Sequence, residues 1–568
     1  MFGFVKPPRH PLSDVRSAER WLGDLATNDP LGGIAELVRE LGRIADPTHS
    51  PRPSELQALF FADANAGDMR RQIIAQYLEH ATRSETIERK LWDALIDLTN
   101  AFLQAFAACE REALRREHDA KWQALLPELL AREVMQLAFE AKLRMLRYEQ
   151  WIPGKWAELH ARFALARARR IHRQRLMLPD ERVPITIERK YIATLLLHVC
   201  NAGNLDRAQL EWVSAHLDNW CMPLRMRTRS PGTNAFFIDL AQRHGLRRRG
   251  TAPLEGEVLF LETDRLCSLL RHYILAVEQK IRSQPLSAKT PRRIERLALL
   301  TKLAAQVDPA FRPVPRRGER MAATGEIHAI VGLANVLGYL REEEQRRAVP
   351  ELDTVGSFTG TIDIAVFGRV RKSEDQRKEL ARRRLAAFSA QGGPWQIRDV
   401  SATGMRVVAP MAAAGALTLG MLVGLRADDD AVWKLGIVRR MRRISAERAE
   451  VGLQRIADSI AGVDLKSERG DADNRYIVEG ETVPRRDGAF RALFLALHEA
   501  RRGEVVQSLI LPIAEYHAGK RFRLQTPSSS YPIRFGRLIE QQSNWVWTAI
   551  EPLPIAQSHP VALSAAAD

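Results

Sequence analysis

The chain has 568 residues, of which 45% are apolar, and a net charge of +16. This length allows three or four domains. The apolar content is that of an ordinary folded protein and excludes wholesale disorder. The excess of basic residues suits a polyanionic partner, unless the arginines simply form a solvated surface. The four cysteines lie too far apart in the sequence to form a zinc knuckle. The N-terminal residues lack the apolar core of a signal peptide. The longest apolar window, residues 411–425, is too short to cross a bilayer. We therefore predict a cytoplasmic protein without membrane insertion.

Residues 1–345 are predicted to form an all-α region. Apolar residues recur every three or four positions from Asp14 onward, a spacing typical of amphipathic helices. The prolines between positions 47 and 53 indicate a loop, and a longer helix is expected to begin near Asp68. Later helices are expected over residues 125–148, 156–172, 191–200, 210–220 and 261–281.

Two short runs interrupt this helical pattern. Residues 236–240 and 258–261 consist largely of Phe, Ile, Leu and Val, which favour strands. If both runs are strands, Arg247 to Arg249 lie in an exposed hairpin loop between them.

The helical region contains no catalytic motif. It has no His-Glu-x-x-His, no Gly-x-Ser-x-Gly and no phosphate-binding Gly-x-x-x-x-Gly-Lys sequence, and its histidines are dispersed. We therefore predict no enzymatic activity, no catalytic residue, no metal and no cofactor. The region is expected to carry the output of the protein or to bind a protein partner that the sequence does not identify.

The composition changes near Pro350. Strand-forming and turn residues fill positions 356–370, and the densest basic run of the chain follows at 369–384. Short strand patterns then recur over residues 395–456 without helical crossovers, which is typical of a small antiparallel barrel. This first β module is expected to span residues 350–466.

A polar turn in this module carries the residues best suited to binding a ligand. Asp399-x-Ser401-x-x-Gly404 places an acid, a hydroxyl and a glycine in one turn, and strand patterns follow at 433–440 and 451–455. These sequences resemble the PilZ domain family, whose members are six-stranded barrels that bind the bacterial second messenger cyclic di-GMP. The resemblance implies that Asp399, Ser401 and Gly404 belong to a cyclic di-GMP site.

Arginines are expected to complete that site. A guanidinium matches the O6 and N7 edge of guanine, and a carboxylate can accept hydrogen bonds from guanine N–H groups. The family's first signature, Arg-x-x-x-Arg, leads into the first barrel strand, and Lys378-x-x-x-Arg382 is the nearest match within the basic run. Either residues 385–388 or residues 362–370 would then form the first strand. The candidate arginines are Arg377, Arg382, Arg383 and Arg384.

A second β-rich module is expected at residues 475–556. Its spacing suggests a barrel-like module packed on the first, and residues 557–568 are expected to be a flexible tail. Strand patterns cover residues 492–497, 508–513, 521–525, 533–540 and 545–550.

Together these patterns predict a multidomain α+β protein with a large all-α N-terminal region, a PilZ-like antiparallel β-barrel and a second small β-rich module. The expected function is that of a non-catalytic cyclic di-GMP effector that signals through its helical region; by resemblance to the family, its output concerns motility or biofilm formation. Two alternatives stay open. In the first alternative, the barrel has lost the ligand and serves as a protein-interaction scaffold. In the second, the chain is a basic nucleic-acid-binding regulator whose affinity for nucleic acid falls steeply with salt.

Overall fold

In the computed structural model the chain divides into two compact units, residues 1–316 with 440–446 and residues 317–439 with 447–568. The described residues are 10–25, 29–80, 84–178, 183–201, 203–229, 235–249, 258–283, 290–311, 320–348, 388, 393–414, 417–427, 432–467, 475–478, 481–484, 489–498, 505–517, 519–526, 529–542 and 544–554.

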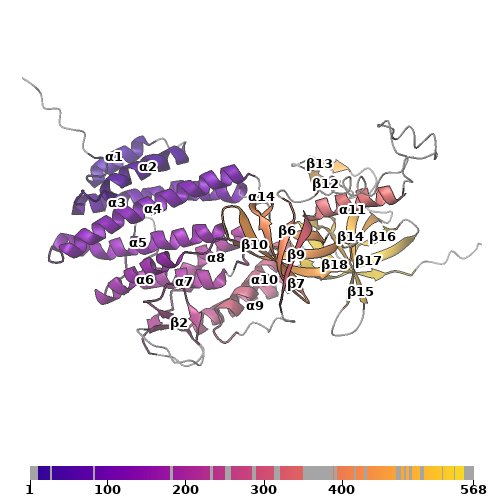
Figure 1. Cartoon of the computed structure of the whole chain (residues 1–568). Coiled ribbons are helices and arrows are strands. Elements are labelled where there is room, and N and C mark those ends of the chain that lie inside the picture. Colours follow the sequence, from indigo (N-terminus) through magenta and orange to yellow (C-terminus); the bar gives the residue numbers. More distant parts are fainter. Residues whose placement is uncertain are drawn as a thin grey trace, which may run out of the picture. The chain divides into compact units, whose positions relative to one another are not determined.

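The first unit is predominantly helical, as predicted. Figure 1 shows the long helices α3, α4 and α5 running side by side. Among the described residues, no helix combines the length and the apolarity needed to cross a bilayer. The helices of this unit are α1 (Val15–Asp24), α2 (Pro30–Ala45), α3 (Pro53–His80), α4 (Glu85–Arg115), α5 (Ala120–Leu146), α6 (Pro153–Ala168), α7 (Ile187–Cys200), α8 (Arg207–Trp220), α9 (Asp264–Ser283) and α10 (Thr290–Val307).

Capping residues determine where several of these helices begin. The Asp29 carboxylate accepts a hydrogen bond from a first-turn N–H of α2, and Asp206 and Gln209 form a reciprocal capping box at α8. The prediction that the third helix begins near Asp68 is wrong, because α3 already begins at Pro53. Proline suits the first helical position, where a backbone N–H has no intrahelical acceptor, so the proline-rich segment leads directly into the helix.

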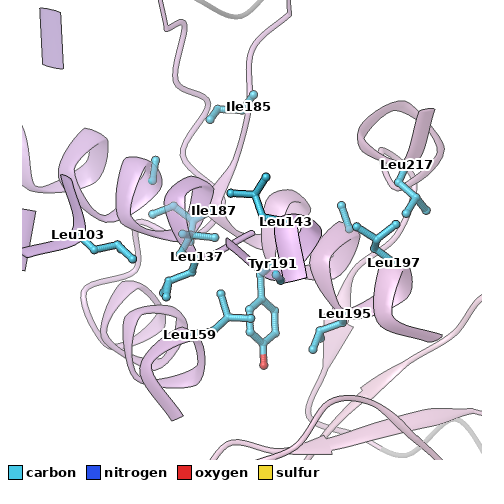
Figure 2. Packing of buried hydrophobic residues seen from close by; sticks show 14 of the residues in the cluster. Leu103, Leu137, Leu143, Leu159, Ile185, Ile187, Tyr191, Leu195, Leu197 and Leu217 are labelled. Atoms are coloured by element: carbon cyan, nitrogen blue, oxygen red, sulfur yellow. The ribbon is translucent and has the colours of Figure 1, made fainter. Parts of the chain in front are cut away.

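Helix α7 lies at the centre of this unit. Eleven of its 14 residues are buried, and a helix that is buried on every side belongs to the interior of a domain. Figure 2 shows Tyr191 of α7 beside Leu159 of α6, with Leu137 and Leu143 of α5 nearby. The Tyr191 ring also stacks on Phe163, with ring centroids 3.9 Å apart. These contacts bring α5 and α6 onto the same helix.

A four-stranded sheet also belongs to this unit, so residues 1–345 are not all-α. Its order is β1-β4-β2-β3, and β2 and β4 confirm the two strands predicted here. The strands are β1 (Met226–Arg227), β2 (Phe236–Asp239), β3 (Arg247–Arg248) and β4 (Val258–Leu261).

The prediction of an exposed arginine loop between these strands is wrong. Arg247 and Arg248 form β3 and pair with β2. The Arg248 guanidinium lies over the ring of Phe236, 5.2 Å from its centroid, and donates a hydrogen bond to the carbonyl of Gln306 at 2.5 Å. An arginine that packs on an aromatic ring and finds an acceptor can sit in a strand.

The second unit contains the predicted antiparallel barrel. Six strands close in the ring order β10-β7-β6-β5-β8-β9. They are β5 (Met321–Val331), β6 (Trp395–Ser401), β7 (Gly404–Pro410), β8 (Leu422–Arg426), β9 (Lys434–Arg443) and β10 (Arg448–Ala457), and the short helix α14 (Met411–Ala414) follows β7.

The first barrel strand lies upstream of the predicted module boundary at residue 350. Strand β5 pairs with β6, although α11 (Leu333–Ala348) and residues 349–394 come between them in sequence. The two segments predicted as first strands, 362–370 and 385–388, lie outside the described residues except for Phe388. The boundary was misplaced because neighbouring antiparallel strands are usually joined by short connections, and a long insertion hides such a pair.

A second closed barrel follows in the same unit, in the ring order β11-β14-β15-β18-β17-β16. Its strands confirm the β-rich C-terminal module, which begins at Ala461 instead of residue 475. The strands are β11 (Ala461–Ser467), β14 (Ala489–His498), β15 (Val505–Pro512), β16 (Arg521–Gln525), β17 (Ser530–Gln541) and β18 (Trp545–Pro552); β12 (Arg475–Val478) and β13 (Glu481–Pro484) form a separate hairpin.

The two barrels have the same topology. Numbered along the chain within each barrel, the strands of both follow the ring 1-2-3-6-5-4. The barrels share a hydrophobic cluster with α11, to which Val336, Trp433, Leu493 and Trp545 contribute. Figure 1 shows α11 lying along the second barrel, which it contacts at β11 and β14. A shared core of this kind predicts that the two barrels form one folding unit.

Candidate ligand-binding site

The charged site of the first barrel is centred on Asp399, the acid that the sequence singled out. Its side chain is only 8% exposed and binds two arginines. Arg320 Nη1 donates to Oδ1 at 3.1 Å, and Arg406 Nε donates to Oδ2 at 2.6 Å. Charge-assisted hydrogen bonds of this length both neutralise the buried carboxylate and orient the two guanidinium groups.

Strand pairing brings these side chains to the outer face of the barrel. Asp399 lies opposite Arg406 on β7 and opposite Ala322 on β5, and directly opposed residues share a face of the sheet. A β-bulge follows Ile397, whose partner Val407 is fully buried in the barrel. Without the bulge, Asp399 would share the inward face of Ile397. The extra residue therefore turns the carboxylate outward.

A second carboxylate extends the cluster. Glu450 on β10 lies 3.4 Å from Arg406 Nη1, so the charges alternate along Arg320, Asp399, Arg406 and Glu450. Both arginine side chains are more than a third exposed, at 36% and 39%, whereas the carboxylates are 8% and 13% exposed. The sheltered acids thus hold two guanidinium groups that keep donors available to an external ligand.

The predicted turn residues Ser401 and Gly404 close the hairpin beside this cluster. The Ser401 hydroxyl donates to the Gly404 carbonyl at 3.2 Å. A Cβ atom on Gly404 would lie 2.3 Å from the carbonyl oxygen of Leu453 on β10, so only glycine fits this approach of two strands. The Arg455 N–H donates to the carbonyl of Thr403 at 3.0 Å and holds the turn against β10. Both predicted residues therefore have structural roles.

On the matching strands of the second barrel, the described residues of this face are mainly apolar, although Arg491 on β14 pairs with Glu344 of α11 and Asp464 of β11. Strands two, three and six of the first barrel are β6, β7 and β10, which carry Asp399, Arg406 and Glu450. Their counterparts β14, β15 and β18 direct apolar side chains into the core shared with the first barrel and α11. The equivalent face of the second barrel is therefore covered, and its outward residues include Leu493, Leu495, Ile510, Trp545 and Trp547.

The structure adds residues that the sequence interpretation missed. Arg320, Arg406 and Glu450 contact the cluster but were not predicted. A signal for one of them was present, because Arg316-x-x-x-Arg320 directly precedes β5 and has the spacing sought in the basic run. Arg316 lies outside the described residues, as do the predicted Arg377, Arg382, Arg383 and Arg384. Within the described part of the chain, no group of three or more His, Cys, Asp or Glu side chains is placed to hold a metal ion.

A comparison with known protein families finds a match to the N-terminal part of the chain. Residues 16–229 match the model of a family described as the cyclic-di-GMP receptor FimW, N-terminal domain. The matched segment runs from α1 to the residues just after β1, so it lies in the helical unit and includes neither barrel. No curated protein sequence and no solved structure matches the chain.

Proposed function

We propose that the chain is a non-catalytic cyclic di-GMP effector whose first barrel binds the messenger on the outer face that carries Arg320, Asp399 and Arg406. The observation that carries this proposal is the placement of two half-exposed guanidinium groups on one sheltered carboxylate. Arg320 lies immediately before the first barrel strand, and Asp399 begins the Asp-x-Ser-x-x-Gly turn. The hydrogen bond between Arg320 and Asp399 supports the proposal that these two segments act together as the two motifs of a PilZ-like site.

The chemistry of the ligand suits these groups. Cyclic di-GMP presents two guanine edges and two phosphodiesters, and a guanidinium fork can bind either one bidentately. In our proposal Asp399 holds the two arginines in position and accepts a hydrogen bond from a guanine N–H. Ser401 and Gly404 keep the turn packed against β10. Arg316 is proposed to contribute as the first arginine of the Arg-x-x-x-Arg pair.

The basic segment downstream of α11 is proposed to add further contacts. Arg377, Arg382, Arg383 and Arg384 belong to a run inserted between the first two barrel strands. The insertion joins α11 to the start of β6, the strand that carries Asp399, and we propose that its positive charge attracts the ligand phosphates.

The family match, which covers an N-terminal segment of the chain, also supports cyclic di-GMP as the ligand. The helical unit is similar to the N-terminal domain of a cyclic di-GMP receptor. We propose that this unit carries the output and binds a protein partner when the barrel is occupied. By resemblance to PilZ proteins, that output is regulation of motility or biofilm formation.

Isothermal titration of the full chain with cyclic di-GMP tests this function. We expect saturable binding to the wild-type protein and a loss of about tenfold or more in Arg320→Ala, since one arginine–guanine contact is worth about 1–3 kcal/mol. Arg521→Ala removes an exposed arginine of the second barrel and should leave the affinity unchanged. Absence of binding at high micromolar ligand would favour the scaffold alternative. Salt-sensitive binding of an oligonucleotide in its place would favour the nucleic-acid alternative.

A further inference from the structure

The helical unit contains a groove that the proposed barrel site does not use. It lies between α2 and α4, which pack against each other, and it has a volume of about 770 Å³. Among the described lining residues, those of α2 are all apolar, whereas most of those of α4 are charged. A groove of this size can receive a binding partner, and its two walls indicate what kind of partner fits.

The wall formed by α2 is an apolar stripe. Leu31, Ile34, Ala35 and Val38 lie three and four positions apart along α2, so their side chains share one face of the helix. Leu31 and Val38 are half-buried and Ala35 is exposed, so the described residues cover this face only in part. A partner that covers it would remove apolar surface from water, which favours association.

The wall formed by α4 carries charges of both signs in a fixed order. Lys90, Asp93 and Asp97 are exposed and follow one another at spacings of three and four residues, so they lie on one face of α4. None of the three has an ion-pair partner among the described residues, although Lys90 and Asp93 are only one turn apart. Arg89 also lines the groove, but it already interacts with another part of the protein, so Lys90 is the cation that a partner can use.

The two carboxylates of this wall lack a compensating cation. Burial raises the pKa of Asp97 above its ordinary value, and the neighbouring charge of Asp93 raises it further. Both effects make the ionised form of Asp97 less favourable. A partner that brings a cation to this face would relieve the repulsion between the two acids.

We propose that this groove is the contact surface between two copies of the chain, packed about a two-fold axis that crosses α4 between Lys90 and Asp93. Such an axis sets the two α4 helices antiparallel, so Lys90 of one copy lies opposite Asp93 of the other, and symmetry forms the same pair twice. Asp97 lies one turn farther along and adds negative charge near the incoming lysine. The apolar faces of the two α2 helices cover each other in the same contact, as helices do in a four-helix bundle.

A second copy is the occupant that the charge order on α4 favours. A basic residue followed by acidic residues on one helix face is complementary to the same face in reversed orientation. An isologous contact uses one surface patch on both subunits, so it requires this kind of self-complementarity.

Sedimentation equilibrium of the full chain tests the proposal. We expect a dimer whose dissociation constant rises about tenfold or more in Lys90→Glu and in Asp93→Lys, because each change turns two attractions into repulsions. Ala35→Glu places a charge at an exposed position of the apolar wall and should weaken the dimer as well. Lys121→Glu reverses an exposed charge at the start of α5 in the same unit and should leave the dimer unchanged.

An equimolar mixture of the Lys90→Glu and Asp93→Lys variants gives the sharpest measurement. In the mixed dimer, the remaining Lys90 faces the remaining Asp93, and the two introduced side chains face each other with opposite charges. The mixture should therefore dimerise at least as tightly as the wild type. A variant that fails to fold could not produce this rescue.

Three results would overturn the proposal. The wild-type chain stays monomeric at high micromolar concentration, both charge reversals leave the dimer intact, or the mixture fails to restore it. Asp399→Asn should remain dimeric, which separates this surface from the barrel site. Loss of the dimer in Asp399→Asn would equally overturn the proposal, because the contact would then depend on the barrel.

Discussion

Arg439 on β9 of the first barrel binds both carboxylate oxygens of Glu540 on β17 of the second, with N–O distances of 2.7 and 2.6 Å. Through Nε the same guanidinium donates to Gln454 at 2.7 Å. Gln454 is the cross-strand neighbour of Gly404 in the candidate site. One arginine therefore connects the second barrel to the strand that flanks the ligand-binding turn.

A double-mutant cycle on Arg439→Ala and Glu540→Ala should reveal coupling between the barrels. We expect an interaction energy of about 1 kcal/mol in urea unfolding, because the contact is bidentate but partly solvated. The pair Arg534–Glu551, whose side chains are 48% and 51% exposed within the second barrel, serves as the control and should couple by less than about 0.5 kcal/mol. Equal coupling in the two pairs would show that Arg439 has no special role.

Replacing Gly404 by alanine should destabilise the first barrel. The added methyl group would lie 2.3 Å from the Leu453 carbonyl oxygen, so β7 and β10 must separate. We expect a loss of about 1–3 kcal/mol in the free energy of unfolding, measured by urea denaturation. Gly325→Ala on β5 is the matched control, since its nearest neighbour would lie 3.8 Å away. A Gly404→Ala variant as stable as this control would contradict the predicted clash.

Asp399→Asn should affect both stability and ligand binding. The amide keeps the shape of the side chain but removes the charge that holds Arg320 and Arg406. We expect cyclic di-GMP affinity to fall by about tenfold or more and stability to fall by about 1–2 kcal/mol, measured by calorimetry and denaturation. Asp464→Asn, at an exposed position of β11 where the carboxylate lies 3.6 Å from Arg491, should leave the affinity unchanged and lower the stability by less than about 0.5 kcal/mol. Unchanged affinity in Asp399→Asn would exclude this cluster as the binding site.

Acid should destabilise the helical unit through His160. This fully buried ring accepts a hydrogen bond from the Tyr191 hydroxyl at Nδ1, 2.8 Å away, and donates from Nε2 to the His244 carbonyl at 2.9 Å. Burial lowers the pKa of His160, so the folded state resists protonation while the unfolded state takes up a proton near pH 6.5. Its stabilising contribution is complete above pH 6.5 and is lost as the pH falls towards the lower folded pKa.

Urea unfolding at several pH values between 7 and 5 measures this effect. His160→Gln should unfold with a shallower pH dependence than the wild type, by up to about 1.4 kcal/mol per pH unit. The exposed His118, 95% accessible, provides the control as His118→Gln. An identical slope in His160→Gln and the wild type would mean that His160 titrates normally.

Local sequence patterns determined the helical unit and the turn of the candidate site. The spacing of apolar residues predicted most of the helices of the first unit, because a helix is built from contacts three and four residues apart. Asp399, Ser401 and Gly404 could be identified because they lie in one hairpin, where neighbouring residues set the geometry. The strands of the second barrel were likewise visible as short patterns separated by turns.

Only the tertiary structure decided which arginines meet Asp399. Arg320 stands 79 residues away in sequence, beyond α11 and the basic segment, and no local pattern shows that β5 pairs with β6. The bulge after Ile397, which turns the carboxylate outward, is a property of strand register. The covering of the second barrel's equivalent face likewise depends on how the two barrels pack. Such long-range pairings come from the burial of complete strand faces, which the order of residues in one segment does not reveal.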